Sequence, residues 1–513
     1  MKIPDRPKKV MTRREFVKKG IQGGIIVTAT PVIMSSLLSG CAPSPVAPKV
    51  PWQLTPEILQ KLLDIALSKG GDFADIYVEH RISTQISLEE NLIKSLDYGV
   101  SQGVGIRVIA GEEVGYSYTD DLAMKKLEET ARTAAYIAAT GIKPSIANLA
   151  ERSVKKNIIV ELGMDKVIEK KKVLLMQAAN EAARAFDPAV KEVTVSYADE
   201  IKNVIIANSE GRLVHDEQPL FRLGVSALAV RNDVRQMGSE SLSERSGYEV
   251  FKQVSPADLG KEAARQAVAM LDAREAPTGE MPVIIANGWG GVLIHEAIGH
   301  GFEGDFIRKK TSFYTDKVGQ KVASENVSIV DDGSLRNRRG TLNADDEGTI
   351  TRRNIMIENG ICQGFLYDIF NAGLMKTYST GNARRQSFRY IPIPRMTNTF
   401  MLAGEDAVED MVRRTNRGLR VRKLGGGQVD ITSGNFVFQV TEAYMIERGR
   451  ATYPVKGATL IGNGPEVLTK VDMVGPDLGY GPGSCGKDGQ SVPCCVGQPT
   501  VRISAITVGG TRV

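Results

Sequence analysis

The first half of the chain alternates between apolar stripes with helical spacing and segments with strand spacing. Thr55-Pro56-Glu57 precedes a stripe that runs from Ile58 to Leu67 and ends at Gly70-Gly71, so a cap and a first-turn proline predict a helix there. The same spacing predicts further helices over residues 122–140, 165–186 and 255–274. Alternating apolar and polar positions predict strands at residues 74–78, 84–88, 104–109 and across 190–230.

The second half begins with a strand, a turn and a helix. Residues 282–286 predict a short buried strand, residues 287–291 form a glycine-rich turn, and Leu293 and Ile294 then open a buried helix. Further on, the chain is glycine-rich and strand-like, notably at residues 425–434 and 436–444.

The pattern is interrupted between the halves, at Pro277-Thr278-Gly279. A chain of 513 residues is long enough for two cores. We therefore predict an α+β fold with two mixed α/β domains, residues 54–276 and 277–513. The second domain is expected to be strand-rich and to carry the helix that begins near Leu293.

Composition and charge narrow the class of protein. Hydrophobic residues make up 42% and charged residues 24%, which is typical of a globular chain. The net charge is +5, but residues 1–20 hold eight Lys or Arg against Asp5 and Glu15, a local balance of +6 that leaves −1 for the rest. Phosphate backbones require a basic surface, so direct nucleic-acid binding is not expected.

The amino terminus has the pattern of a targeting signal. Thr12-Arg13-Arg14-Glu15-Phe16 is a twin-arginine motif, a moderately apolar stretch follows at residues 20–38, and Leu38-Ser39-Gly40-Cys41 resembles a lipobox. We predict a signal peptide at residues 1–40, lipidation of Cys41, a proline-rich tether at 41–53, and export by the twin-arginine route to the periplasm. An uncleaved membrane anchor is the alternative, but the apolar stretch is short and interrupted by Gln22, Gly23 and Gly24.

Two of only four histidines lie five residues apart in His295-Glu296-Ala297-Ile298-Gly299-His300. In common zinc peptidases the two histidines of His-Glu-x-x-His share one helix face. On a regular helix five steps rotate the side chains apart by roughly 140°. A π-bulge would restore a common face, and a helix that ends at Gly299, with His300 in the next turn, would also serve. Polar groups buried here without a ligand would be unfavourable, so the motif predicts a metal site.

A catalytic zinc site has three protein ligands and one open position, so a third ligand must come from elsewhere. Cys485 is the preferred candidate, because it lies in a glycine-rich segment where Lys487 could help to keep its thiol deprotonated. Cys494, Cys495, Glu303 and Asp305 remain open as alternatives for the third ligand. Cys494 and Cys495 are otherwise expected to be packing residues, with a strained disulfide or an extra metal contact as the alternatives.

Several longer blocks carry a family resemblance. They are residues 102–107, 295–305, 394–399, 425–434, 454–460 and 485–493. In these blocks the chain resembles the TldD branch of the TldD/PmbA peptidases, a family linked to modulation of DNA gyrase. The resemblance implies that His295, His300 and Cys485 bind the metal and that Glu296 is the general base. It also implies action on short or unfolded peptides within a dimer, often with a PmbA-type partner that lacks the motif.

We therefore expect a metallopeptidase in which Glu296 shuttles the proton of a metal-activated water. Zinc is favoured by the ligand types, with Fe2+ as the alternative. Extended peptides are expected to bind as an added strand. The second hypothesis is a non-catalytic peptide-binding or assembly subunit, and the third is a metal-dependent hydrolase of a non-peptide amide.

Overall fold

A long antiparallel sheet forms the amino-terminal part of the molecule. The computed structural model describes residues 54–138 and 146–510. The sheet has the order β3-β2-β1-β5-β6-β4, and β7 pairs with β6. Its strands are β1 (Phe73–Glu89), β2 (Leu92–Ala110), β3 (Glu113–Thr119), β4 (Ala150–Glu151), β5 (Val190–Asn208), β6 (Arg212–Arg231) and β7 (Val234–Glu244).

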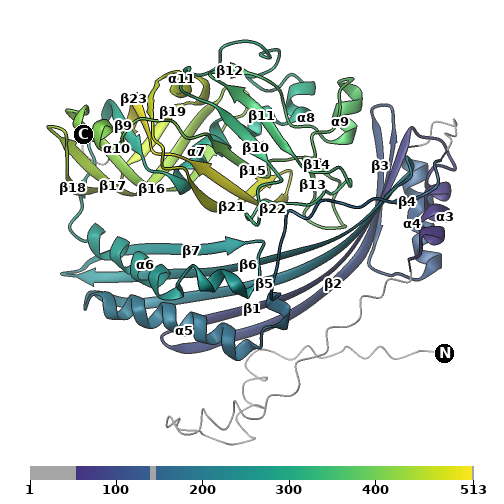
Figure 1. Cartoon of the computed structure of the whole chain (residues 1–513), viewed down its shortest axis with the longest axis horizontal. Helices are drawn as coiled ribbons and strands as arrows, with labels where there is room; N and C mark the ends of the chain where they lie inside the picture. The colour runs from purple at the N-terminus through teal and green to yellow at the C-terminus, as the bar shows by residue number, and fades with distance from the viewer. Residues whose placement is uncertain (1–53, 139–145, 511–513) are drawn as a thin grey trace, which may run out of the picture. The chain divides into compact units, whose positions relative to one another are not determined.

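Two pairs of helices cover this sheet in different places. Helices α3 (Pro56–Ala66) and α4 (Met124–Ile137) pack on β1, β2 and β3, whereas α5 (Glu169–Phe186) and α6 (Pro256–Met270) lie side by side against β5, β6 and β7 (Figure 1). Each pair has its own buried apolar cluster. Short 3-10 turns occur at Met164–Lys166 (η1) and Tyr248–Lys252 (η2).

The carboxy-terminal part contains two larger sheets. The first has the order β16-β9-β23-β19-β17-β18-β8, with β20 beside β23, and the additional pairing of β16 with β17 closes five strands into a ring. Its strands are β8 (Arg274–Glu275), β9 (Gly279–Ile285), β16 (Arg417–Val429), β17 (Asn435–Glu447), β18 (Arg450–Lys456), β19 (Thr459–Asn463), β20 (Val471–Val474) and β23 (Val501–Gly509).

The second sheet has the order β12-β11-β10-β15-β22-β21. Its strands are β10 (Ile329–Asp332), β11 (Arg353–Glu358), β12 (Ile361–Cys362), β15 (Asn398–Met401), β21 (Gly479–Lys487) and β22 (Gln490–Gln498), and β13 (Ala383–Arg384) pairs with β14 (Ile393–Pro394). The remaining helices are η3 (Gly288–Gly291), α7 (Val292–Ala297), η4 (Gly299–Phe302), α8 (Gly304–Arg308), α9 (Ile369–Leu374), α10 (Val408–Arg413) and α11 (Gly464–Thr469).

Helix α7 lies between the ring and the second sheet. It contacts β16 and β17 of the ring and β15 and β22 of the second sheet. Leu293 and Ile294 are buried in the main apolar cluster of this region, as predicted for the helix that they open. The core therefore fixes the motif helix on both sides, with the edge strand β21 next to β22.

The predicted α+β fold class is confirmed, and several predicted elements differ in extent. The two strands expected at residues 74–78 and 84–88 form the single strand β1, and the strand expected at 104–109 is the buried end of the 19-residue strand β2. Residues 92–100 of β2 are exposed, so they lack the alternation that signals a half-buried strand. The two-domain division at residues 276 and 277 remains a prediction.

Candidate metal centre

The two motif histidines lie on consecutive short helices. Helix α7 ends at Ala297, Ile298 leaves helical geometry with φ −129° and ψ −55°, and His300 lies in the 3-10 turn η4. The widened π-helix is therefore not found, and a helix break, close to the other predicted arrangement, takes its place. The break turns His300 back toward His295, so that the ring centroids are 5.0 Å apart at an interplanar angle of 83°.

Gly299 is required at the break for its small size. A Cβ atom added there would lie 1.9 Å from Sδ of Met396, which is fully buried. Gly299 therefore permits the close approach of the Met396 side chain to the turn, rather than a bulge in the helix. This contact holds η4, and with it the His300 ring, against the neighbouring segment.

Cys485 reaches the histidines from the edge strand β21. Its Sγ lies 3.7 Å from Nε2 of His300, and the thiol is buried. The three ligand atoms of His295, His300 and Cys485 all lie within 4.8 Å of one another. Within residues 54–138 and 146–510, this is the only group of three or more such side chains close enough to hold an ion. The structure thus brings the three predicted ligands together.

The donor set fits a divalent metal ion. Burial raises the pKa of the Cys485 thiol, but His295 and His300 outweigh burial and bring the net pKa well below its usual range. Nδ1 of His295 is buried and has no hydrogen-bond partner among the residues that the structure describes. A thiolate and two imidazoles are the ligand types of zinc sites, and a buried nitrogen without a partner is unfavourable unless a ligand satisfies it.

Glu303 orients the His300 ring. Its Oε2 lies 3.0 Å from Nδ1 of His300 and 2.9 Å from Nζ of Lys487. Burial raises the pKa of Glu303, but Lys487 and His300 outweigh that effect and hold the pKa at about 2. The carboxylate therefore fixes Nδ1 as the donor and leaves Nε2 facing Cys485, an arrangement typical of histidine ligands.

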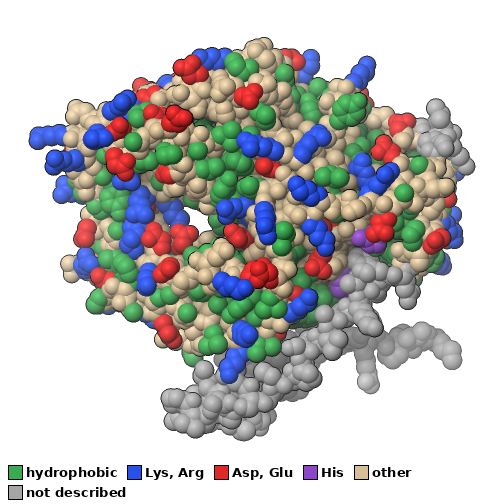
Figure 2. Space-filling view, in the orientation of Figure 1, with side chains coloured by type: hydrophobic (Ala, Val, Ile, Leu, Met, Phe, Trp, Pro, Cys, Tyr) green, Lys and Arg blue, Asp and Glu red, His purple; other side chains and the backbone are tan. Residues whose placement is uncertain are grey.

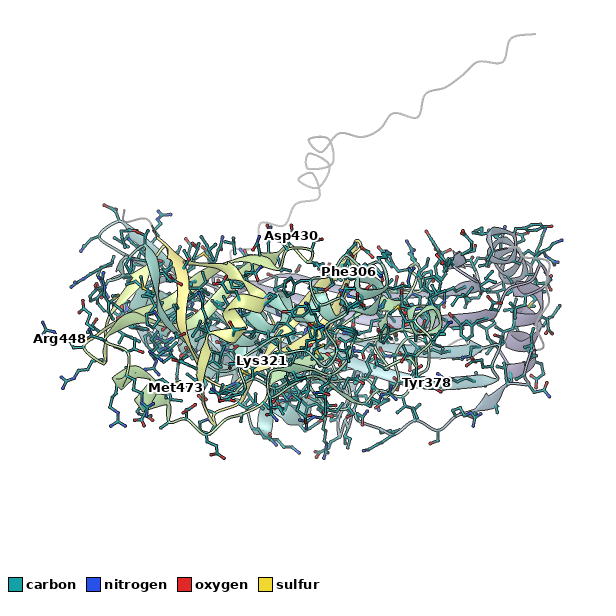
Figure 3. All side chains as sticks on the ribbon, turned by 90° about the horizontal axis from the view of Figure 1, so that it is seen from above. Phe306, Lys321, Tyr378, Asp430, Arg448 and Met473 are labelled. Atoms are coloured by element: carbon teal, nitrogen blue, oxygen red, sulfur yellow. The ribbon has the colours of Figure 1, made fainter. Side chains whose placement is uncertain are left out.

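Two predictions about neighbouring residues need correction. Glu303 was an alternative third ligand, but it contacts the nitrogen of His300 that faces away from Cys485. Lys487 was expected to stabilise the thiolate, but its Nζ contacts Glu303 and, at 2.7 Å, Asp305. The same Nζ lies 4.3 Å from the centre of the Phe306 ring, a residue labelled in Figure 3. His300 and Glu303 are three residues apart, about one helical turn, and this spacing was the sequence signal for the His300–Glu303 pair.

Glu296 lies at the accessible side of the centre. Its Oε2 is 4.0 Å from Nε2 of His300, and its side chain is 23% exposed, whereas that of His300 is 7% exposed. A carboxylate in this position can reach both the ligand cluster and solvent.

Cys494 and Cys495 lie next to each other on β22. Both thiols are free and buried, so the strained disulfide is not formed. Successive strand side chains point to opposite faces, and neither cysteine belongs to the ligand group of the described residues. Burial raises the pKa of both thiols, to about 12 for Cys495, which is consistent with packing residues.

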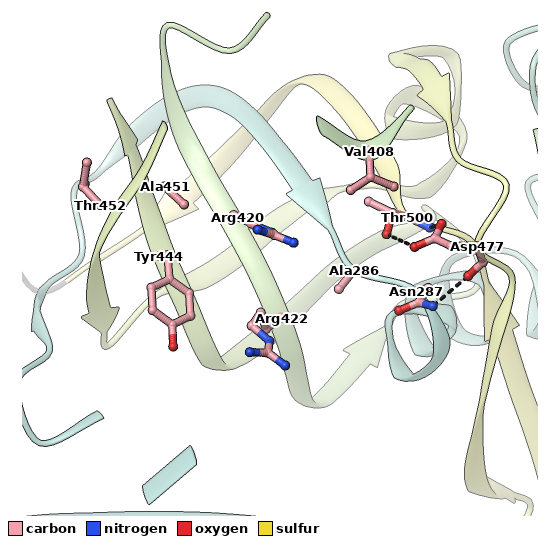
Figure 4. Close-up of a pocket in the computed structure, with 10 residues that line it drawn as sticks. All are labelled: Ala286, Asn287, Val408, Arg420, Arg422, Tyr444, Ala451, Thr452, Asp477 and Thr500. Atoms are coloured by element: carbon pink, nitrogen blue, oxygen red, sulfur yellow. Dashed lines mark hydrogen bonds between the residues drawn. The ribbon is translucent and has the colours of Figure 1, made fainter. Parts of the chain in front are cut away.

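A separate cavity of about 600 Å³ lies near the start of η3 (Figure 4). It contains none of the four predicted site residues. Asp477 in its wall already accepts hydrogen bonds from the amide and hydroxyl of Thr500, and Asn287 donates to the carbonyl of Asp477. Asp477, Thr500 and Asn287 in this wall are therefore already hydrogen-bonded to one another.

A buried set of two imidazoles and a thiolate, with a carboxylate at its accessible side, is the constellation of a metal-dependent hydrolase. Three family models match the chain in succession: PmbA/TldA metallopeptidase domain 1 at residues 74–138, the central domain at 164–271 and the C-terminal domain at 278–510. The chain belongs to the PmbA/TldA metallopeptidase family.

Individual relatives agree with this assignment. A metalloprotease TldD homolog of Haemophilus influenzae is 42% identical over 473 residues, which cover 90% of this chain and 98% of that protein. A protein of Saccharolobus solfataricus named zinc metalloprotease TldD homolog is 28% identical over 88% of this chain and 99% of its own length. The predicted resemblance to the TldD branch is confirmed.

A solved structure shares the fold. The crystal structure of TldE from Thermococcus kodakarensis superposes with a TM-score of 0.71, at 21% identity, over 88% of this chain and all of that chain. At this identity the likeness establishes the architecture alone.

The comparison corrects the predictions for the amino terminus. The twin-arginine signal, the lipoprotein anchor and the periplasmic location conflict with the family assignment, because the match to the Haemophilus protein leaves only 2% of that protein outside it and so no room for an equivalent leader. These predictions are therefore wrong by this comparison. Residues 1–53, including Cys41, lie outside the described residues. No helix in the described part is long and apolar enough to cross a membrane.

Proposed function

We propose that this chain is a metal-dependent peptidase of the TldD type that hydrolyses short or unfolded peptides at His295, His300 and Cys485. The observation that carries the proposal is the convergence of three buried ligand atoms within 4.8 Å from two distant segments of the chain. A buried pair of imidazoles beside a thiolate is unfavourable unless a ligand satisfies the atoms that converge.

Zinc is the metal that this donor set favours, because nitrogen and thiolate ligands suit Zn2+, with Fe2+ as the alternative. The name of the Saccharolobus relative supports the same metal. When bound, the ion supplies Lewis acidity that polarises the peptide carbonyl and acidifies the attacking water.

The chain's own residues have distinct tasks in this proposal. Glu296 accepts a proton from the attacking water and delivers it to the leaving amine, which its position 4.0 Å from His300 and its partial exposure allow. Glu303 holds the His300 ring through Nδ1, and Lys487 keeps Glu303 ionised.

An extended substrate has a path toward the centre. Gly479, Gly481 and Pro482 of β21 line a cavity of about 710 Å³ together with Trp289 and the Gly425-Gly426 segment of β16, and Figure 2 shows a hollow between the two halves of the molecule. In the described chain β21 is the last strand of its sheet and carries Cys485. A peptide that enters as an extended chain would therefore run toward the ligand cluster.

The test of the catalytic role is a Glu296→Gln variant assayed on a peptide library. We expect a loss of about 10²- to 10⁴-fold in kcat with unchanged metal content, because the proton acceptor is lost and the ligands are kept. Glu358→Gln, an exposed change on β11, is the matched control and should be neutral. Full activity of Glu296→Gln at equal metal content would refute the assignment, and metal-free protein that still binds peptides would favour the non-catalytic subunit.

A second subunit is part of the proposal. β3 pairs with β2 only from Val104 to Ala110, so residues 92–103 of β2 form an edge that has no further strand beside it in the described chain. Leu96 and Val100 on this edge are 50% and 49% exposed. Apolar exposure along an open strand edge favours a protein partner. A subunit of the same fold fits, either a PmbA-type chain or a second copy, and the similarity to TldE supports this choice.

Sedimentation analysis tests this edge. The double variant Leu96→Asp with Val100→Asp should shift the protein, alone or mixed with a PmbA-type chain, from dimer to monomer. Leu174→Asp on α5, where the side chain is 54% exposed, is the control that should leave the assembly unchanged. An intact dimer in the β2 variant would exclude this edge as the interface.

A further inference from the structure

A small basic cavity lies beside the hairpin that carries Cys485. Its volume is about 300 Å³, and Ser484, Val492 and Pro493 of β21 and β22 form part of its wall. In the hairpin, Ser484 is the neighbour of Cys485 and Val492 is its cross-strand partner. The remaining wall contains six basic side chains and two carboxylates: Arg81, Lys202, Arg245, Arg339, Arg384 and Arg385 against Glu200 and Asp346.

Three arginines in this wall have no acidic partner among the described residues. Arg81 pairs with Glu200 at 3.6 Å, and Arg385 pairs with Asp75 at 3.4 Å. By contrast, three arginines form no ion pair with any described residue: Arg245, Arg339 and Arg384. The cavity therefore contains an excess of positive charge close to the metal ligands.

The unpaired arginines are held by neutral groups. Arg339 donates from Nε to the carbonyl of Gly483 at 2.8 Å, and Arg384 donates from Nη1 to the carbonyl of Met396 at 2.8 Å. Arg245 donates to the carbonyls of Arg339 and Pro219. These contacts fix the guanidinium groups in place but leave their charge without compensation, which is unfavourable for a permanently charged group in a protein interior.

Arg384 combines a charge without an ion-pair partner and an unsatisfied buried donor in the described part of the chain. It is 2% exposed, and its Nε is buried with no hydrogen-bond partner in residues 54–138 and 146–510. Arg395, which donates to the carbonyl of Cys485, has two further buried nitrogens without partners, Nε and Nη1. Burial and the neighbouring Arg395 lower the pKa of Arg384, although Asp346 and Cys494 act against them. The donor of Arg384, which lines the cavity, can be satisfied by an anion bound there.

We propose that this cavity binds the free C-terminal carboxylate of the peptide substrate. The inference rests on the proposed peptidase function and deepens it, because it names the part of the substrate that is recognised. A carboxylate matches the planar fork of a guanidinium and can accept two hydrogen bonds from it. With about 300 Å³ available, the cavity has room for a chain end of one or two residues.

Cleavage close to the C-terminus follows from this geometry. The wall of the cavity includes the strand neighbour of Cys485, and Arg395 contacts the backbone of Cys485 itself. A peptide whose terminal carboxylate is held there has its last few peptide bonds nearest to the ligand cluster. The substrate class is therefore a peptide with a free C-terminus, from which short C-terminal fragments are released.

The decisive comparison uses the wild-type full chain and three peptides that differ only at the C-terminal end. One ends in a free acid, one in an amide, and one in a glutamate whose terminus is amidated. We expect KM for the amide to be about 10- to 100-fold higher than for the acid, with a smaller change in kcat, because a charge-assisted interaction is lost. Equal KM values for the acid and the amide would overturn the proposal. A low KM for the peptide with the amidated glutamate would also overturn it, because the cavity would then recognise an acidic side chain and not the chain end.

A binding measurement separates this inference from the peptidase function. Fluorescence anisotropy with the Glu296→Gln chain measures the affinity for the acid and amide peptides without turnover. Tighter binding of the acid, even if wild type cleaves neither peptide, supports the carboxylate site and refutes the peptidase. Cleavage without any preference for the acid supports the peptidase and refutes the carboxylate site.

Substitutions in the arginine cluster test which side chain binds the carboxylate. Arg384→Gln should bring the ratio of acid to amide affinity close to unity while affinity for the amide is kept, and Arg384→Lys should restore part of the preference because the charge returns. Arg231→Gln, which changes an arginine that is 42% exposed and pairs with Asp272, is the control that should keep the full ratio. If Arg384→Gln does not fold, Arg339→Gln, in a partly exposed position, provides the same test. An unchanged ratio in a folded Arg384→Gln or Arg339→Gln chain would overturn the assignment.

Discussion

Two buried polar clusters in this molecule differ in how their groups are satisfied. The guanidinium of Arg107, which is 1% exposed, pairs with Asp75 and, at 2.6 Å, with Glu347. The second carboxylate oxygen of Glu347 accepts a hydrogen bond from the backbone amide of Ile369 at 2.7 Å. Around His300, by contrast, three ligand atoms converge and the nearby Nδ1 of His295 has no partner. The first cluster is complete within the described chain, whereas the second requires a ligand.

This difference indicates which cluster is structural and which is functional. Arg107 of β2 and Glu347, which follows the second sheet's β10 by more than ten residues, join the amino-terminal sheet to the carboxy-terminal part. A complete network of this kind adds specificity to the packing of the two parts. An incomplete set of donors in a core, such as the metal centre or the basic cavity, is a signature of binding.

The largest expected effect lies in the complete cluster. Arg107→Met leaves the buried carboxylate of Glu347 without its counter-charge and leaves Asp75 with Arg385 alone, so we expect it to lower the free energy of unfolding by about 3–5 kcal/mol. Chemical denaturation measures this effect. Lys126→Met, which breaks an exposed pair with Glu129 on α4, is the control and should leave stability unchanged within error. A loss below about 1 kcal/mol for Arg107→Met would show that the cluster does not hold the two parts together.

The next effect lies in the incomplete cluster. Glu303→Gln removes the charge that orients His300, so we expect metal affinity to fall by about 10- to 100-fold, as is typical for such partners of a ligand. Competition with a chelator of known affinity measures the change. Glu325→Gln, in an exposed loop position, is the matched control. Unchanged metal affinity in Glu303→Gln would mean that His300 is oriented by other contacts.

A smaller effect is expected at the helix break. Gly299→Ala places a Cβ against Met396, and overpacking of this kind costs about 1–3 kcal/mol and displaces the His300 turn. The double variant with Met396→Ala creates space for the new methyl group and should recover part of the metal affinity. Thermal unfolding and chelator competition together test this coupling. If the double variant is no better than Gly299→Ala alone, the contact is not what holds the turn.

The smallest effect is expected at the second cysteine of the vicinal pair. Cys495→Ala should lower stability by only about 1 kcal/mol, because one buried sulfur is lost, and should leave metal content unchanged. Elemental analysis of this variant beside wild type provides the comparison. Loss of the metal in Cys495→Ala would instead show that the Cys495 thiol contributes to metal binding.

Local signals predicted much of the fold. Pro56 marked the start of α3, and α6 lies within the helix predicted over residues 255–274. The exposed half of β2 was missed, because its side chains face solvent and follow no alternation. A strand of this kind is defined by its pairing with β1, which residue patterns do not reveal.

The site was predictable where its residues lie close together in sequence. The motif identified His295 and His300, and the family resemblance supported Cys485. The form of the helix break could not be derived, because it depends on a contact between Gly299 and Met396, two residues that are far apart in sequence. The full lining of the basic cavity could not be predicted for the same reason. Arg245, Arg339 and Arg384 come from separate segments and meet only in the folded chain.

Metal content is the measurement that tests the central claim most directly. Elemental analysis of the purified wild-type chain and of Cys485→Ser should find about one divalent ion per wild-type chain and little in the folded variant, because a three-ligand site loses its thiolate. Peptidase activity should follow the metal content. A wild-type chain that cleaves peptides without any bound metal, or a Cys485→Ser chain that keeps the full complement, would contradict the account.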